Sequence, residues 1–301
     1  MNKMETVTRA ADKDYAFALH GGAGPVAGRN YDSVEEHLSI LTKECEARLA
    51  KGDTALDVVE IAVQELENSG LYVAGRGSAP NSAGYVELDA SIMHGPSREA
   101  GAVAALQGFE NPIRIARGVM EKTPHVLLAG MGARAFAIEH AYAEVADPDN
   151  YYVMPVGVTQ EDLTNASKHG TVGAVARDTS GALAAGTSTG GTFGKLEGRV
   201  GDTPLIGPGT WADDDIAISF TGTGEHIIRS GGAVAIACAY KFGGDLDKAV
   251  TNVLDEIERL GGDAGVIAIT RELGISMLYN SDGMKRGSVS TEQPLYVATF
   301  A

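Results

Sequence analysis

Pairs of apolar strands alternate with pairs of amphipathic helices along this chain, and this order constrains the fold more than any single motif. The segments 86–93 and 100–106 are joined by His94-Gly95-Pro96-Ser97, a turn so short that the two strands must form an antiparallel hairpin. A second hairpin is predicted from 171 to 188 around Thr179-Ser180-Gly181. Hairpins separated by helix pairs predict a four-layer αββα sandwich, in which two stacked, largely antiparallel sheets lie between outer helices.

The remaining elements are predicted from the spacing of apolar residues. A recurrence every three or four positions predicts helices at 33–51, 54–66, 112–122, 133–145, 224–241 and 245–260. Short apolar runs predict strands at 15–20, 126–129, 216–221, 265–270, 275–280 and 295–300. Residues 146–170 have no sustained period, and we expect an exposed loop there.

Composition limits the classes of function. Asp and Glu number 40 against 24 Lys and Arg, and a net charge of −16 with no basic cluster argues against nucleic acids and anionic membranes as partners. No apolar window is long enough to span a bilayer, and the opening residues 1–5 lack the apolar stretch of a secretory signal. Cys45 and Cys238 are too few for a disulfide framework, and we expect both to be buried thiols. A single-domain cytoplasmic protein is therefore expected.

The pair Gly170-Thr171 stands at the entrance to the second hairpin. A threonine hydroxyl is a weak nucleophile unless a base lies beside it, and an N-terminal threonine carries that base as its own α-amine, whose pKa is about 7.7–8.0. Glycine before the bond leaves its carbonyl open to attack and tolerates strained backbone. We predict that the chain cuts itself here into segments 1–170 and 171–301, although a Gly-Thr pair that merely enters a strand is commoner in proteins at large.

Several glycine-rich and hydroxyl-rich loops accompany this pair. They are His20-Gly21-Gly22-Ala23-Gly24, Glu87-Leu88-Asp89-Ala90, His169-Gly170-Thr171-Val172-Gly173-Ala174, Thr187-Ser188-Thr189-Gly190-Gly191, Gly198-Arg199-Val200-Gly201-Asp202, Thr221-Gly222-Thr223-Gly224-Glu225 and Gly261-Gly262-Asp263-Ala264-Gly265. In this order and spacing, the chain resembles the plant-type asparaginases and isoaspartyl peptidases of the Ntn-hydrolase superfamily over nearly its whole length.

The resemblance implies roles for particular residues. Thr171 would be the nucleophile, and Thr189 would hydrogen-bond beside it and assist. The hydroxyl of Thr221 and the backbone N–H of Gly222 would stabilise the oxyanion, because both are hydrogen-bond donors. The family requires no cofactor for this chemistry.

The same resemblance implies a clamp for an aspartyl group. Arg199 would hold the α-carboxylate of the substrate, while Asp202 and the region of Gly224 would hold its α-ammonium. Gly222 would also contact the substrate. A substrate held in this way presents its side-chain carbonyl to Thr171, so the expected substrates are β-aspartyl dipeptides and L-asparagine, cleaved through an acyl-enzyme. The alternative interpretation is a local surface salt bridge between Arg199 and Asp202.

A structural sodium ion and an assembly of two processed chains, (αβ)2, are also implied. The ion would be bound by the main-chain carbonyls of Leu66, Glu67, Ser69, Tyr72, Ala74 and Arg76. Three features depart from the family pattern: Val73 replaces the usual Asn near the amine of the nucleophile, His94 replaces an Asp, and the segment 146–170 is short. We assign no function to His94.

Other readings of the sequence remain open at this point. A glycosylasparaginase is disfavoured because no secretory signal is visible. A relative specialised for dipeptides such as β-Asp-Arg, from cyanophycin breakdown, would suit the acidic surface. A phosphate-binding protein or kinase lacks its phosphate-binding loop motif, since no G-x-x-x-x-G-K-[ST] pattern is present. The last alternative is a homologue that neither cuts itself nor catalyses and acts as a binding or assembly partner.

Overall fold

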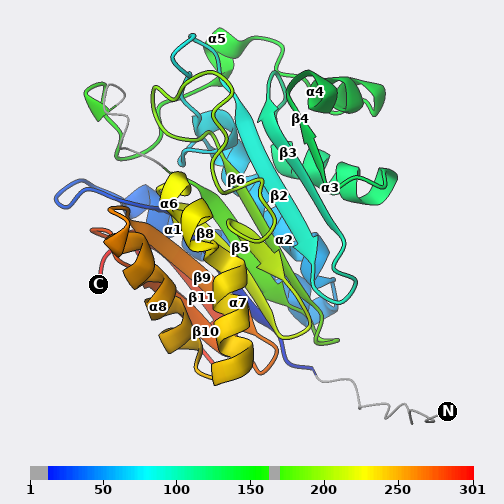
Figure 1. Ribbon diagram of the computed structural model, residues 1–301, viewed down its shortest axis with the longest axis vertical. Helices are drawn as coiled ribbons and strands as arrows, with labels where there is room; N and C mark the ends of the chain where they lie inside the picture. Colours follow the sequence, from blue (N-terminus) through cyan, green and yellow to red (C-terminus); the bar gives the residue numbers. More distant parts are fainter. Residues whose placement is uncertain (1–12, 163–169) are drawn as a thin grey trace.

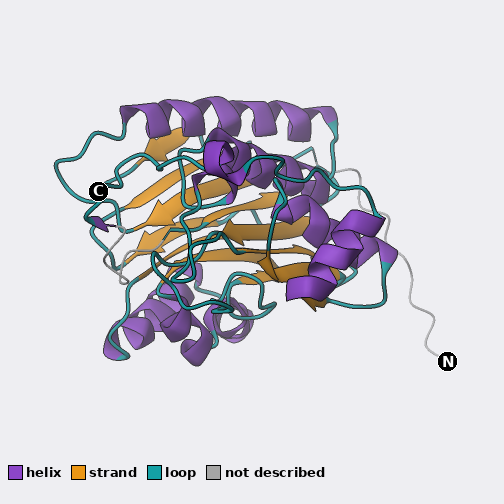
Figure 2. Cartoon of the chain, turned by 90° about the horizontal axis from the view of Figure 1, so that it is seen from above, coloured by secondary structure: helices purple, strands orange, loops and turns teal. Residues whose placement is uncertain are grey.

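Two stacked β-sheets lie between outer layers of helices in the computed structural model of the chain, which describes residues 13–162 and 170–301 (Figures 1 and 2). The larger sheet has eight strands in the order β12-β11-β1-β5-β6-β2-β3-β4. The smaller has four in the order β10-β9-β8-β7. Every pairing is antiparallel except that of β3 with β4. The predicted αββα sandwich is therefore confirmed.

The strands of the large sheet are β1 (Ala16–Ala23), β2 (Leu88–His94), β3 (Ala100–Leu106), β4 (Leu127–Ala129), β5 (Val172–Arg177), β6 (Leu183–Thr189), β11 (Met284–Ser290) and β12 (Tyr296–Ala298). Those of the small sheet are β7 (Thr210–Ala212), β8 (Ile216–Gly222), β9 (Ala264–Thr270) and β10 (Ile275–Tyr279). The helices are α1 (Asp32–Lys51), α2 (Ala55–Ser69), α3 (Pro112–Lys122), α4 (Gly130–Glu139), α5 (Pro148–Tyr151), α6 (Gly224–Ser230), α7 (Gly232–Gly243) and α8 (Leu246–Arg259), with a 3-10 turn at Gly75–Gly77.

Three apolar clusters hold the layers together. The largest packs α1, α2 and α3 against the outer face of the large sheet, and a second packs α7 and α8 against the outer face of the small sheet. Between the sheets, small side chains such as Ala18, Ala185 and Ala217 let the two strand layers approach closely. The layer order follows from these faces, because each sheet has two apolar surfaces to cover.

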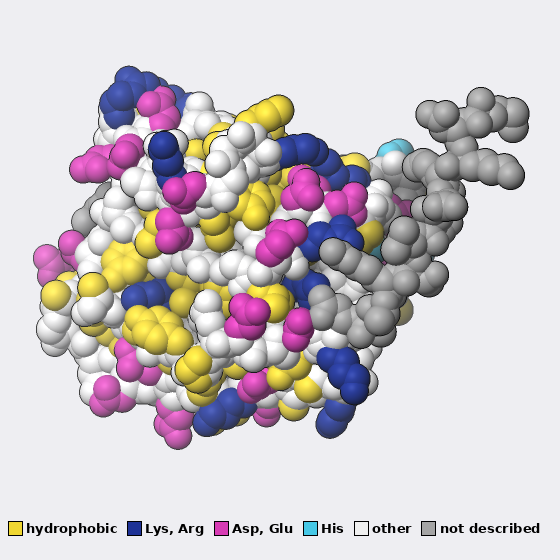
Figure 3. All heavy atoms as spheres, turned by 90° about the horizontal axis from the view of Figure 1, so that it is seen from below, with side chains coloured by type: hydrophobic (Ala, Val, Ile, Leu, Met, Phe, Trp, Pro, Cys, Tyr) yellow, Lys and Arg dark blue, Asp and Glu magenta, His cyan; other side chains and the backbone are white. Residues whose placement is uncertain are grey.

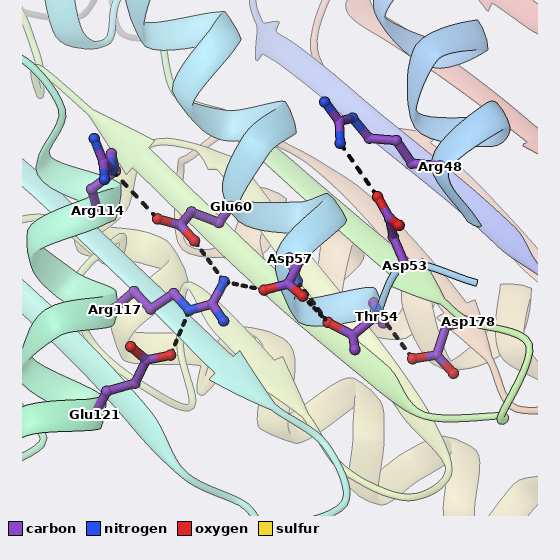
Figure 4. Close-up of polar contacts among 10 residues, drawn as sticks. Arg48, Asp53, Thr54, Asp57, Glu60, Arg114, Arg117, Glu121 and Asp178 are labelled. Atoms are coloured by element: carbon purple, nitrogen blue, oxygen red, sulfur yellow. Dashed lines mark hydrogen bonds and ion pairs between the residues drawn. The ribbon is translucent and has the colours of Figure 1, made fainter. Parts of the chain in front are cut away.

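Ion pairs tie α2 to its neighbours (Figure 4). The Arg117 guanidinium on α3 contacts the carboxylates of Asp57 and Glu60 on α2 at 2.6 Å and 2.5 Å. At the start of α2, Thr54 accepts a hydrogen bond from the N–H of Asp57, as its sequence position predicts. The Asp178 carboxylate, in the β5–β6 turn, accepts a 2.9 Å hydrogen bond from the N–H of Ala55. The helix is thereby fixed to the hairpin that begins at Thr171.

Some predicted elements need correction. The sequence did not predict strand β11, because charged residues are not typical of a strand that is buried along its whole length. The three-residue strand β7 was also not predicted. The predicted helix 224–241 is two helices that meet at Gly231, and α4 ends at Glu139 rather than 145. The loop expected at 146–170 contains the short α5; its residues 163–169, including His169, lie outside the described residues.

The surface mixes both signs of charge with apolar residues on the face shown in Figure 3. Among residues 13–162 and 170–301, no helix is long and apolar enough to cross a membrane. Cys45 is buried on α1, and burial raises the pKa of its thiol to about 12, but Cys238 is exposed. The expectation of two buried thiols was therefore wrong for Cys238, which lies on the solvent side of α7.

Candidate active site

The predicted site residues gather at one end of the sandwich. In antiparallel sheets, the start of one strand lies beside the end of its neighbour. Thr171 thus precedes β5 where β1 and β6 end, and β6 ends at Thr189, directly opposite Asp89 at the start of β2. From the second sheet, β8 reaches the same end at Gly222. A small cavity there is lined by Gly170, Thr171, Thr189, Gly191, Thr192, Arg199, Gly201, Asp202, Thr203 and Gly222.

Three oxygen atoms form a tight group at the Gly170–Thr171 bond. The Thr171 Oγ1 lies 2.8 Å from the carbonyl oxygen of Gly170 and 3.2 Å from the Oγ1 of Thr189. The Thr189 hydroxyl accepts a 2.9 Å hydrogen bond from the N–H of Gly191 and donates one of 2.7 Å to the Gly170 carbonyl. Thr171 and Thr189 are 5% and 3% exposed. The carbonyl before Thr171 is therefore polarised by one hydroxyl and approached by another.

Val73 packs directly against Gly170. An added Cβ at Gly170 would lie 2.7 Å from the Cβ and Cγ2 of Val73, so only glycine fits in this position. Val73 is itself fixed because its carbonyl accepts a 3.0 Å hydrogen bond from the N–H of Gly190, next to Thr189. The departure from the family pattern thus places an apolar side chain against the predicted cutting site.

The backbone of Thr171 is held by the end of β1. His20 Nδ1 lies 3.1 Å from the Thr171 carbonyl oxygen, and its Nε2 lies 3.0 Å from the hydroxyl of Ser219 on β8. Burial lowers the pKa of His20 to about 3, so the ring is neutral at working pH. At Gly22, whose φ is +105°, a Cβ would lie 3.3–3.4 Å from the Thr171 backbone, so the glycine permits this close approach. His20 therefore positions the strand entry and carries no charge.

Arg199 forms its salt bridge with a partner that the sequence analysis did not name. Its Nε and Nη2 donate hydrogen bonds of 2.8 Å to the two carboxylate oxygens of Glu225. Burial alone would lower the pKa of Arg199, but the bonds to Glu225 raise it above its ordinary value. Atoms of Arg199 and Asp202 both face Gly224, where a Cβ would lie 3.0 Å from the Arg199 Nη2 and 2.9 Å from the Asp202 Oδ1. The predicted cation and anion of the clamp are thus side by side.

Glu87, Asp89 and Lys195 anchor the loop that carries Arg199. The Glu87 carboxylate accepts hydrogen bonds of 3.1 Å from the N–H of Gly198, and Lys195 donates one of 2.9 Å to the Glu87 carbonyl. Burial raises the pKa of Asp89, while the nearby charge of Lys195 opposes that shift. The acidic residues stood in a recognised motif but had no assigned role, and Lys195 was missed. Lys195 is only 4% exposed, but a single lysine in the sequence gives no sign that it will be buried beside acidic residues.

Thr221 is placed differently from Gly222. Gly222 lines the small cavity, but Thr221 is fully buried beside it, and its Oγ1 accepts a 3.1 Å hydrogen bond from the N–H of Ala23. The described contacts do not include one between Thr221 and Thr171. The oxyanion role of both residues stays a prediction, and in this uncut chain the hydroxyl of Thr221 serves to join β8 to the end of β1.

The loop of predicted carbonyl ligands folds back on the end of α2. A Cβ at Gly75 would lie 2.6 Å from the Glu67 carbonyl oxygen, and one at Gly77 would lie 1.9 Å from that of Tyr72. The side chain of Glu67 points elsewhere, since it accepts a 3.1 Å hydrogen bond from the N–H of Ile113. No cluster of three acidic, histidine or cysteine side chains suited to a metal occurs in the described parts of the chain.

His94 lies far from this site, which agrees with its having no assigned function. It pairs with Ala184 at the opposite end of β2 from Asp89, and its Nδ1 lies 2.9 Å from the hydroxyl of Ser97 in the turn.

Comparison with known proteins identifies the family. A sequence profile described as asparaginase matches residues 13–298. The chain belongs to the asparaginase family. An isoaspartyl peptidase of Salmonella typhimurium is 40% identical over 90% of this chain and 93% of its own length. A plant-type L-asparaginase of Pyrobaculum calidifontis is 39% identical over 90% and 95%, respectively. An isoaspartyl peptidase/L-asparaginase of Rattus norvegicus is 38% identical over 88% and 83%.

Membership of the asparaginase family confirms the resemblance drawn from the loops. It agrees with the two stacked sheets of the structure, and it makes a hydrolase the expected class of enzyme. The interpretations as a phosphate-binding protein or kinase find no support in these relatives.

Proposed function

We propose that this protein is a threonine-type amidohydrolase that cuts its own chain before Thr171 and then hydrolyses β-aspartyl dipeptides and L-asparagine. The observation that carries this proposal is the group of oxygens at Gly170, Thr171 and Thr189. These oxygens line the same cavity as the cation of Arg199 and the anion of Asp202. The names of the relatives, isoaspartyl peptidase and plant-type L-asparaginase, support the same substrates.

Self-cutting begins with attack of the Thr171 Oγ1 on the Gly170 carbonyl carbon. The C–N bond breaks, the Thr171 nitrogen takes the proton that the attacking hydroxyl gives up and becomes the α-amine, and Gly170 is left as an ester on the hydroxyl oxygen. Water hydrolyses this ester, which frees the Gly170 carboxylate and restores the Thr171 hydroxyl. The donated hydrogen bond from Thr189 stabilises negative charge on the Gly170 oxygen while the tetrahedral intermediate exists.

Hydrolysis of the substrate repeats these steps on a different carbonyl. The α-amine of Thr171 takes the hydroxyl proton as Oγ1 attacks the β-carbonyl, and it passes that proton to the departing amine. Water then releases aspartate from the acyl-enzyme. Arg199 and Asp202 hold the α-carboxylate and α-ammonium, and Gly222 offers its N–H to the oxyanion. Because both charges lie on one side of Thr171, the β-carbonyl is the one presented to Oγ1.

The test measures the intact mass of the purified chain after incubation and then the aspartate released from each substrate. Two fragments that meet between Gly170 and Thr171, together with release of aspartate from β-Asp-Leu and from L-asparagine, are expected. A chain that stays whole while it hydrolyses both substrates would sink the mechanism. A chain that is cut but hydrolyses neither substrate would refute the proposed substrate class and favour a homologue without catalytic activity.

Replacing Arg199 with lysine is expected to raise the KM for L-asparagine while self-cutting proceeds normally. Lysine keeps the charge but has a single nitrogen, so it cannot hold Glu225 as Nε and Nη2 of Arg199 do and also donate fully to the substrate carboxylate. The weakened charge-assisted hydrogen bond costs about 1.5–3 kcal/mol, or roughly 10- to 100-fold in KM. Steady-state kinetics and intact mass measure the two effects. If cutting also fails, Arg199 supports the fold through its bonds to Glu225, and Glu225→Gln separates the two roles because it leaves the cation in place.

We also propose that the loop after α2 binds sodium through the main-chain carbonyls of Leu66, Glu67, Ser69, Tyr72, Ala74 and Arg76. Carbonyl oxygens are the ligands that hard cations prefer, and Gly75 and Gly77 let the loop fold closely onto two of them. The ion would serve to hold the loop that carries Val73. The melting temperature should be about 3 °C higher in sodium chloride than in choline chloride of equal ionic strength, as for a ligand near ten times its Kd. Equal melting temperatures in the two salts would refute the proposed sodium site.

Association of two processed chains and a cytoplasmic location both stay predictions. Sedimentation of the processed protein would check the first.

A further inference from the structure

A buried ammonium lies on the Gly170 side of the cutting site. Lys285 is on β11, where two residues of β1, Gly21 and Gly22, stand opposite it in an irregularity of the β1–β11 pairing. An added Cβ at Gly21 would lie 3.4 Å from the Lys285 Cβ, and one at Gly22 would touch the Thr171 backbone. One short stretch of β1 therefore separates Lys285 from the proposed nucleophile.

Lys285 has no acidic partner among the described residues. Lys285 is 9% exposed, and its Nζ lies 5.3 Å from the ring centroid of Tyr31. No hydrogen bond or ion pair of the Nζ occurs in the described parts of the chain. Burial lowers the pKa of this amine to about 8. Such a buried cation is rare in proteins unless a counter-charge is bound there for at least part of the time.

The ammonium lines a second cavity, which Gly170 separates from the cavity of Arg199 and Asp202. Gly170 lines both. The rest of the second cavity is lined largely by backbone and by apolar or aromatic side chains, among them Val26, Tyr31, Val73, Val156 and Phe193. Arg29, the other cation here, is already bound to the Asp162 carboxylate at 2.5 Å. In the uncut chain the free volume is about 30 Å³, room for roughly two waters, so a larger group can enter only after Gly170 is displaced.

We propose that this second cavity binds the leaving amino acid of a β-aspartyl dipeptide, with Lys285 on its α-carboxylate and the apolar wall around its side chain. The inference rests on the proposed function, in which Arg199 and Asp202 hold the aspartyl half on the other side of Thr171. The leaving residue extends from the scissile amide away from the aspartyl half. The cavity of Lys285 lies across Gly170 from the cavity of Arg199 and Asp202, so the leaving residue reaches Lys285 once cutting has released Gly170. The substrate class is then a β-aspartyl dipeptide with an apolar second residue. A cationic second residue such as arginine is disfavoured by the charge of Lys285, since that of Arg29 is already balanced by Asp162.

The test compares three substrates of the processed enzyme: β-Asp-Leu, its C-terminal amide, and L-asparagine. The wild type should prefer β-Asp-Leu over the amide, because only the acid carries the carboxylate. Lys285→Met should lower kcat/KM for β-Asp-Leu roughly 10- to 100-fold, the range for a lost charge-assisted hydrogen bond, and change the values for the amide and for L-asparagine less than about threefold. Lys285→Arg should restore part of the preference, and Lys241→Met, at an exposed lysine, should change none of the three values.

The other outcomes overturn the proposal in distinguishable ways. Equal losses on all three substrates would make Lys285 a support of the Thr171 backbone. If Lys285→Met fails to cut itself, the wild-type comparison of acid and amide still decides, because equal rates would show that no cation binds the carboxylate. Faster hydrolysis of β-Asp-Arg than of β-Asp-Leu would overturn the apolar preference. Failure of the wild type on every substrate would instead refute the proposed function itself.

Discussion

Alanine in place of Thr171 is expected to give a folded chain that stays whole and hydrolyses neither β-aspartyl peptides nor L-asparagine. Both reactions start from the same Oγ1, which in the structure lies 2.8 Å from the Gly170 carbonyl oxygen. No described hydroxyl other than that of Thr189 shares this position. Loss of the nucleophile should lower kcat by a factor on the order of 10⁴ or more. Intact mass after days of incubation and an assay of released aspartate measure the two losses separately.

The control for this variant is Thr171→Ser. Serine keeps the hydroxyl and its partners but loses the methyl group that limits rotation about χ1, so cutting should continue more slowly. Thr171→Ala should melt close to the wild-type precursor, because the hydroxyl contacts only Gly170 and Thr189 and the backbone contact of residue 171 with His20 is kept. An alanine variant that still releases aspartate would show that another group is the nucleophile.

Much of the architecture could be predicted because hairpins and amphipathic helices leave periodic patterns. The exact bounds of β3 and α3 follow from such patterns. Strand β11 could not be found in this way, since Lys285 and Arg286 suggest an exposed turn. Both are nonetheless buried, and the Arg286 guanidinium donates to the Met284 carbonyl and the Tyr296 hydroxyl. A buried strand whose arginine donates to carbonyl and hydroxyl groups and whose lysine faces a cavity has no signature in one sequence.

The sequence marks residues that the fold brings together at the candidate site, but it does not reveal how their side chains pair. Glycine-rich loops marked Thr171, Thr189, Arg199 and Asp202, and antiparallel topology brings them to one end. The bond from Arg199 to Glu225 spans 26 positions and depends on how α6 follows β8, which composition does not encode. Likewise, the contact of Val73 with Gly170 could not be foreseen: the replacement was visible, but not the surface it would touch.

Valine in place of Thr189 is expected to slow self-cutting by roughly 10²- to 10³-fold, the usual effect of removing one oxyanion donor. Valine has nearly the shape of threonine, so the loss is confined to the hydroxyl. The direction of that hydroxyl is fixed by its partners. It accepts a hydrogen bond from the Gly191 N–H, and its own proton points to the Gly170 carbonyl at 2.7 Å. The half-time for appearance of the two fragments, followed by intact mass, measures the effect.

Thr189→Ser is the matched control, because it returns the donor and should restore cutting to within about tenfold of the wild type. The buried Gly191 N–H loses its acceptor in the valine variant, which costs about 1–3 kcal/mol of stability and is measured separately by denaturation. If Thr189→Val cuts at the wild-type rate, the charge on the Gly170 oxygen must be stabilised by backbone groups alone. If serine and valine slow cutting equally, the methyl group and its packing matter, and the hydroxyl has no direct role in the first step.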